Sequence, residues 1–286
     1  MAALDHPSDR ADDASGRLSR QLLVIVDPVA MRADGESVRI AKDVLCAGST
    51  AKVCLPEGPA EFAKALAKRG VRRPVVIGDD RALLRAVSLL HRERELSGAV
   101  FSMVPVGAAV SLAHSLGVPA GTVEAARAAL DGAPRWLDLL VDDSDGVVLG
   151  GLSIPPIADP SASGPPGGRP WRRMYGSLVR NLAARSPRGE VADEAPATRL
   201  RIEADGVTLV DLDQQVRGVS VTPGAGDGLA RVEVRRAAGA AVSVRAHTVT
   251  VTGADFRYRA DQVTIGGPVR RRTWSVRAGA WALALP

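Results

Sequence analysis

The chain has 286 residues, of which 46% are hydrophobic and 24% charged, a composition typical of a soluble globular protein large enough for two domains. Its net charge of +5 comes almost wholly from Arg residues scattered among acidic ones, and only 3% of the residues are aromatic, which argues against a nucleic-acid-binding surface. Two cysteines, Cys46 and Cys54, lack the spacing of a metal site and indicate free thiols in a reducing compartment.

Residues 1–20 are polar and acidic, which predicts a flexible leader and no signal peptide. No stretch approaches the roughly 20 apolar residues that a membrane-spanning helix needs. The sequence therefore predicts a cytoplasmic protein.

From Gln21 onward, short apolar runs alternate with segments of helical periodicity. The continuous apolar run Gln21–Val26 predicts a strand buried on both faces, which ends at Asp27-Pro28. The same reading predicts strands over Ala51–Leu55, Val75–Ile77 and Ala99–Val104, and helices over Glu36–Leu45, Glu61–Lys68, Arg81–Glu95, Gly107–Leu116 and Val123–Leu130. This alternation predicts an N-terminal α/β nucleotide-binding-type domain over 21–136, with a mostly parallel sheet.

The pattern changes between Pro134 and Leu149, where short β runs replace the alternation. Asp205-Gly206, between two such runs, is a strong hairpin signal. Closely spaced strands with turn residues between them predict a C-terminal antiparallel β-sandwich domain over 137–286.

Two stretches rich in Pro, Gly and Ser, Pro155–Pro170 and Ser186–Pro196, are predicted to be loops. Between them, Trp171–Ala184 carries an apolar stripe at helical spacing. Either this helix packs its stripe on the domain, or its Trp and Arg residues make a peripheral contact with an anionic membrane surface.

Two strand–turn–helix segments carry the candidate site. The first, Pro74–Val87, contains the turn Gly78-Asp79-Asp80, and the second, Met103–Ala109, contains Gly107. Turns at the ends of parallel strands face one crevice, and the unpaired N–H groups at a helix start can bind phosphate. We expect Asp80 to cap the helix that begins at Arg81, and the turn to present free backbone donors to an anion.

At these positions the sequence resembles the diacylglycerol kinase catalytic family, which includes bacterial lipid kinases and sphingosine kinases. The resemblance covers roughly residues 21–286. The family's Asn-Pro, its loop Gly-Gly-Asp-Gly-Thr and its loop Pro-Leu-Gly-Thr-Gly-Asn-Asp correspond to Asp27-Pro28, to residues 78–82 and to residues 105–111. The family's later Asp-Asp-Gly and Asp-Gly-Glu correspond to 226–228 and to Asp261-Gln262-Val263.

The resemblance implies a nucleotide-binding domain joined to a β-sandwich domain, with the active site in the cleft between them. It implies ATP and Mg²⁺ as cofactors, a lipid hydroxyl as substrate, Asp80 as catalytic residue, and Asp80 and Asp227 as metal ligands. The implied cofactor-binding residues are Asp27, Gly78, Asp79, Arg81, Ala82, Gly107 and Ala108.

The departures from the family fall on the chemistry. Arg81 and Ala82 replace a Gly and the Thr of the first loop, Val110 replaces the Asn of the second, and Val263 replaces the Glu that acts on the substrate hydroxyl. Loss of a positioned general base typically costs about 10²–10⁴ in rate. The sequence therefore predicts a catalytically impaired lipid-kinase-like protein that retains weak, Mg²⁺-dependent nucleotide binding, or lipid binding, in the cleft.

Two alternatives remain open. In the first, the protein is an active ATP-dependent kinase of a diacylglycerol-type lipid. Altered motifs are compatible with activity because phosphoryl transfer relies mainly on positioning and charge. In the second, it is a non-catalytic structural protein with an empty cleft. The sequence does not reveal an oligomeric state.

Overall fold

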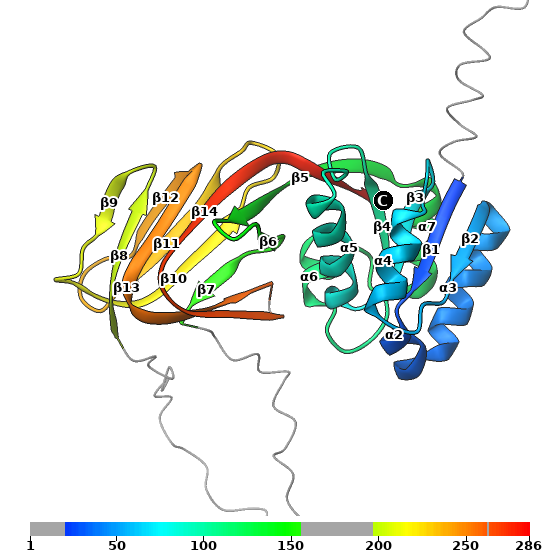
Figure 1. Ribbon diagram of the computed structural model, residues 1–286, viewed down its shortest axis with the longest axis horizontal. Coiled ribbons are helices and arrows are strands. Elements are labelled where there is room, and N and C mark those ends of the chain that lie inside the picture. Colours follow the sequence, from blue (N-terminus) through cyan, green and yellow to red (C-terminus); the bar gives the residue numbers. More distant parts are fainter. Residues whose placement is uncertain (1–20, 156–196, 262) are drawn as a thin grey trace, which may run out of the picture.

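The computed structural model describes residues 21–155, 197–261 and 263–286. In Figure 1 an α/β part with helices on both faces of its sheet stands beside a strand-rich part, and the long strand β14 (Thr264–Leu285) runs from one to the other. The predictions for residues 1–20, for the loops within 156–196 and for the helix over Trp171–Ala184 lie outside the described residues.

Four strands form the sheet of the α/β part in the order β4-β3-β1-β2. They are β1 (Gln21–Val26), β2 (Thr50–Cys54), β3 (Arg73–Gly78) and β4 (Val100–Pro105). Each neighbouring pair runs parallel. The carboxyl ends of these strands therefore lie at one edge of the sheet, where Asp27 and Gly78 are found.

The helices of this part are α2 (Pro28–Ala33), α3 (Gly35–Gly48), α4 (Pro59–Ala67), α5 (Asp80–Arg92), α6 (Ser111–Ser115) and α7 (Thr122–Asp131). The predictions missed α2, whose start is fixed by the Asp27 side chain and by Pro at its first position. The expected helix over Gly107–Leu116 was too long, because Gly107 has a φ of +122° and the chain becomes helical only at Ser111. None of the helices in the described residues is long and apolar enough to cross a membrane.

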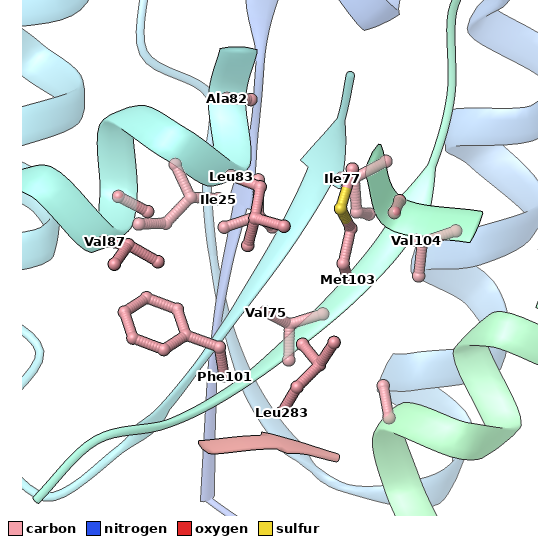
Figure 2. Packing of buried hydrophobic residues seen from close by; sticks show 14 of the residues in the cluster. Ile25, Val75, Ile77, Ala82, Leu83, Val87, Phe101, Met103, Val104 and Leu283 are labelled. Atoms are coloured by element: carbon pink, nitrogen blue, oxygen red, sulfur yellow. The ribbon is translucent and has the colours of Figure 1, made fainter. Parts of the chain in front are cut away.

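One hydrophobic core lies between the parallel sheet and its helices. Figure 2 shows part of it, where Leu83 and Val87 of α5 lie near Ile25 of β1 and Phe101 of β4. The spacing of the buried residues along α5 turns one face to the sheet, as the apolar stripe predicts.

The remaining strands are mostly antiparallel. They are β5 (Ala133–Asp142), β6 (Val147–Val148), β7 (Leu152–Ile154), β8 (Thr198–Ala204), β9 (Val207–Val210), β10 (Gln215–Pro223), β11 (Ala230–Arg236), β12 (Val242–Ala246), β13 (Thr248–Ala260) and β14. The predicted hairpin is confirmed: β8 pairs with β9 across a turn in which Asp205 and Gly206 have φ values of +48° and +80°.

These strands enclose a second hydrophobic core. Strand β10 pairs with β7, β7 with β13, β13 with β8, and β8 again with β10, so the sheet closes on itself. The pairings do not separate two sheets, and the expected sandwich stays a prediction.

The end of β14 returns to the α/β part. Ala282 and Leu283 pair in parallel with Val100 and Phe101 of β4, and Leu283 lies close to Val75 and Phe101 in Figure 2. The buried Trp281 packs edge-on to Phe101, with ring centroids 6.1 Å apart. The last residues thus belong to the core of the first part, although the predicted second domain spans 137–286.

Candidate functional site

The turn after β3 begins helix α5 with a different cap from the one expected. Asp79 is the N-cap, and its Oδ1 accepts hydrogen bonds from the N–H groups of Arg81 and Ala82 at 3.0 and 3.1 Å. The prediction that Asp80 caps this helix was wrong. Asp79 has the extended backbone that an N-cap needs, whereas Asp80 is already helical.

Asp80 instead links the two loops of the site. Its carboxylate oxygens accept hydrogen bonds from the N–H groups of Leu112 and Ala113, both at 2.9 Å, at the start of α6. Its own N–H donates to the carbonyl of Ala109 at 2.8 Å. Burial raises the pKa of this carboxyl, and the negative charge of Asp79 adds to the effect, while the two amide hydrogen bonds oppose it. With 1% of its surface exposed, Asp80 holds α6 against α5.

Asp27, at the end of β1, is also held inside the protein. Its Oδ1 accepts the N–H of Val29 at 2.7 Å, and its Oδ2 accepts a hydrogen bond from Arg85 of α5 at 2.8 Å. The guanidinium of Arg85 lies 5.4 Å from the centre of the Phe62 ring. This ion pair therefore ties the first helix turn of α2 to α5.

Gly78 allows the close approach of β1 and α5 at this point. A Cβ atom at Gly78 would lie 2.8 Å from the Cβ of Ala82 and 3.0 Å from that of Asp27, which is too close. The buried Ala82 fills the space directly beside the turn. The small residues here serve backbone packing, a role that a sequence motif alone does not distinguish from ligand binding.

The second loop approaches the first through backbone contacts. The N–H of Val106 donates to the carbonyl of Gly78 at 2.8 Å, and the Cβ position of Gly107 is 3.5 Å from the Cβ of Asp79. Gly107 and Ala108 are exposed, as is Arg81, whose guanidinium lies 4.0 Å from Asp79. Arg81, Gly107 and Ala108 are the predicted cofactor-binding residues that stay accessible.

The turn does not fit a magnesium-bound triphosphate. The N–H groups of residues 80, 81 and 82 already donate to Ala109 and Asp79, so the expected free donors were a wrong prediction. Both oxygens of Asp80 are also engaged, which leaves Arg81 as the accessible charge of the turn. In the described residues, no group of three or more His, Cys, Asp or Glu side chains could hold a metal ion.

Asp227, the other predicted metal ligand, lies in the turn before β11. Its Oδ1 accepts the N–H of Leu229 at 3.1 Å, and its Oδ2 forms an ion pair with Arg245 of β12. These contacts stabilise the turn. The Asp227 carboxylate shares no contact residue with the Asp80 carboxylate, which bonds to Leu112 and Ala113.

An apolar hollow lies at the same edge of the parallel sheet, with a volume of about 290 Å³. It is lined by Val26, Pro28, Met31, Arg32, Leu55, Pro56 and Glu57. Ligands of open α/β sheets bind outside the carboxyl ends of the strands, so this hollow is a candidate ligand site.

A larger pocket, of about 470 Å³, lies between α6 and the strands β7, β10 and β13. We call it the interdomain pocket, and its lining is Ser111, Leu112, Ser115, Gly150, Gly151, Leu152, Ser153, Ser220, Thr222, Arg259 and Asp261. The two parts approach closely here, since a Cβ at Gly150 would lie 2.5 Å from a methyl carbon of Leu112. The resemblance to the family implied a site in a cleft between domains. Of the lining residues, Ser111, Leu112 and Asp261 had been aligned with family motifs, and none had been named as a functional residue.

Asp261 is the buried acid of the interdomain pocket. Its Oδ1 accepts hydrogen bonds from the N–H groups of Leu149, Gly150 and Gly151 at 3.1, 2.6 and 3.2 Å, and its Oδ2 accepts one from Leu149 at 3.0 Å. Burial raises its pKa to about 6, and the negative charge of Asp80 acts in the same direction against these hydrogen bonds. From the sequence, Asp261 was interpreted as part of a degraded Asp-Gly-Glu motif. The retained Asp at its first position was the signal that could have identified Asp261 as a site residue.

No family model and no curated protein matches the sequence. Among solved structures, the chain is similar to one described as a diacylglycerol kinase from Bacillus anthracis str. Sterne, with a TM-score of 0.67 and 14% identity over 93% of this chain and 97% of that one. The two proteins share a fold. Two more structures from the same organism give the same TM-score and identity. This similarity supports the resemblance inferred from the motifs at the level of the fold.

An NAD kinase from Archaeoglobus fulgidus in complex with ATP is also similar, with a TM-score of 0.49 and 12% identity over 92% of this chain and 93% of that one. A TM-score this low supports no inference about the present chain.

Proposed function

We propose that this chain is a lipid-kinase-like protein in which phosphoryl transfer is impaired and ligand binding in the interdomain pocket is retained. The observation that carries the proposal is the position of Asp80, whose two carboxylate oxygens both accept backbone hydrogen bonds at 2.9 Å. A carboxylate committed in this way, and almost fully buried, is poorly placed to bind Mg²⁺ or to take part in phosphoryl transfer.

The contacts of the phosphate turn support the same proposal. Its amide donors are used within the protein, so a nucleotide would rely on Arg81 and on the apolar hollow beside Leu55. Nucleotide binding is therefore weak. The interdomain pocket, by contrast, has a volume within the range of small-molecule sites.

Phosphate transfer and nucleotide binding test this proposal separately. Purified full-length protein is incubated with radiolabelled ATP, Mg²⁺ and mixed micelles of diacylglycerol, and the labelled lipid is counted. We expect no transfer above the background without enzyme. Calorimetry with ADP should show weak binding that changes little when Mg²⁺ is removed. Robust turnover, or tight Mg²⁺-dependent binding that is lost in Asp80→Asn, would contradict the proposal.

A second candidate function is an active kinase that uses Asp261 in place of the missing Glu. The supporting observation is that Asp261 lines the interdomain pocket and has a pKa of about 6, close to the value at which a general base works best. Within the described part of the chain, its Oδ2 accepts a single hydrogen bond, from Leu149, and so has capacity for a substrate hydroxyl.

The variant Asp261→Asn distinguishes the two functions. If any transfer is detected, the active-kinase function requires it to fall by about 10²–10⁴ in this variant. The matched control is Asp213→Asn, which changes an exposed acid in the turn before β10. Transfer that is equal in Asp261→Asn and in the control would exclude Asp261 as the base.

A further inference from the structure

Hydroxyl-bearing side chains gather in the interdomain pocket. Five of its lining residues carry a hydroxyl: Ser111, Ser115, Ser153, Ser220 and Thr222. Leu112 and Leu152 are its only aliphatic side chains larger than a methyl group among the described residues. Small-molecule pockets are usually lined mainly by apolar and aromatic side chains, with a few polar groups. Hydroxyl groups are therefore unusually numerous in this pocket.

The strand register explains how the hydroxyls come together. Ser153 of β7 lies opposite Ser220 of β10 on one side and opposite Arg259 of β13 on the other. Side chains of directly opposite residues share a face of the sheet, so these three form one row across three strands. Thr222 follows Ser220 by two residues and lies on the same face, while Val219 and Val221 turn into the core.

The row faces the short helix α6, which supplies Ser111 and Ser115 to the opposite wall. The Ser115 hydroxyl already donates to the carbonyl of Leu112 at 2.7 Å. The hydroxyls of Ser153, Ser220 and Thr222 have no hydrogen-bond partner among the described residues. They thus line the pocket as donors and acceptors that have no partner in the described part of the chain and that water or a ligand can satisfy.

Covering such a wall with a hydrocarbon chain is unfavourable. A hydroxyl that loses its water partners without gaining a new one costs about 1–3 kcal/mol. A ligand with its own hydroxyls can replace the lost water. Its C–H groups can contact the carbon atoms of the Ser, Gly and Leu residues that lie between the hydroxyls of the lining. Sugars and cyclic polyols have this combination of hydroxyl groups and C–H faces.

We propose that the interdomain pocket binds a polyhydroxylated group, such as a polyol or a sugar, rather than the acylglycerol expected of a diacylglycerol-type lipid kinase. The proposal deepens the proposed function, since it rests on the interdomain pocket as the retained ligand site. The group is either a free polyol or the headgroup of a lipid, and the chemistry of recognition is the same for both.

Saturation-transfer NMR on the full-length protein tests the proposal without nucleotide or Mg²⁺, so that its result does not depend on phosphoryl transfer. The soluble probes are glycerol, sorbitol, glucose and myo-inositol, compared with the short-chain lipid dihexanoylglycerol. A parallel sedimentation assay uses phosphatidylcholine vesicles with and without phosphatidylinositol. We expect binding of a polyol probe, or of phosphatidylinositol vesicles alone if the headgroup must be carried by a lipid.

Two substitutions locate the binding. Ser153→Ala and Ser220→Ala each remove one hydroxyl without adding volume, and each should weaken binding about three- to tenfold. The matched control, Ser243→Ala, removes an exposed hydroxyl from strand β12, which β11 separates from the pocket strand β10, and should leave binding unchanged.

Three results would overturn the proposal. They are tighter binding of dihexanoylglycerol than of every polyol probe, no binding in either the polyol or the phosphatidylinositol arm, and binding that is equally strong in Ser153→Ala, Ser220→Ala and the control. A failure here leaves impaired phosphoryl transfer standing, because that conclusion depends on Asp80 and is measured with ATP.

Discussion

The buried carboxyl of Asp261 should make the stability of the protein depend on pH in a particular direction. Its pKa is about 6 in the folded protein, against an ordinary value of 3.8. The folded state therefore keeps a proton that the unfolded chain releases. The free energy of unfolding falls as the pH rises from about 4 to 6, and above that range the full penalty of ionising Asp261 remains but no longer changes with pH. The difference between the two pKa values corresponds to about 3 kcal/mol.

The perturbation is Asp261→Asn, which cannot ionise. Part of its effect, the altered hydrogen bonding to Leu149, is independent of pH. The other part depends on pH: the variant lacks the free-energy cost of ionising a buried carboxyl, which the wild type incurs as the pH rises. Relative to wild type, the variant should therefore gain about 2 kcal/mol between pH 4 and pH 7, because at pH 4 the unfolded chain has already released part of this proton. Comparing the two pH values cancels the constant part, so the comparison isolates the titration of Asp261.

Urea unfolding at several pH values measures this difference. Tryptophan fluorescence follows the transition, since Trp281 and Trp274 lie in the two hydrophobic cores. Coincident transitions by fluorescence and circular dichroism would justify a two-state analysis. Asp213→Asn serves as the control and should retain the pH dependence of the wild type. A constant stability difference between Asp261→Asn and wild type from pH 4 to pH 7 would refute the reasoning.

Substitutions at Asp80, Gly78 and Arg85, with control variants, test the packing of the site by urea unfolding. Asp80→Ala leaves the buried amides of Leu112 and Ala113 without acceptors and should cost about 2–5 kcal/mol, more than Asp80→Asn, which keeps one acceptor oxygen; equal losses would argue against the cap. Gly78→Ala should cost about 1–3 kcal/mol because its methyl group meets Ala82 at 2.8 Å. Gly98→Ala, with open space around it, should change stability by less than about 0.5 kcal/mol, and a similar loss in both variants would contradict the close approach. Arg85→Met leaves the buried Asp27 unpaired and should cost about 1.5–3 kcal/mol; unchanged stability would mean that this ion pair contributes little.

The local pattern of the sequence was sufficient for many elements of the fold. The apolar run Gln21–Val26 matches β1, and the stripe of Leu83, Val87 and Leu90 faces the core from α5. Asp205-Gly206 forms the predicted hairpin because its two residues adopt the positive φ values that such a turn requires. These features depend on neighbouring residues, and a local reading of the sequence can detect them.

A cleft between the two parts was expected from the resemblance to the family, but its lining was not. Ser153, Ser220 and Arg259 come from three strands far apart in the sequence, and only the register of those strands places them in one row. The return of Leu283 to β4 is also a long-range pairing that no local signal reveals.

The sequence by itself determined that acids occur at the motif positions, and the tertiary structure decided what each acid does. Asp79 and Asp80 are identical neighbours in the sequence, but one caps its own helix and the other caps a helix 32 residues away. Asp261 receives its hydrogen bonds from residues more than 100 positions earlier in the chain. The physical reason is that a carboxylate's burial, pKa and accessible oxygens depend on the donors that surround it, and here the backbone of distant segments supplies those donors.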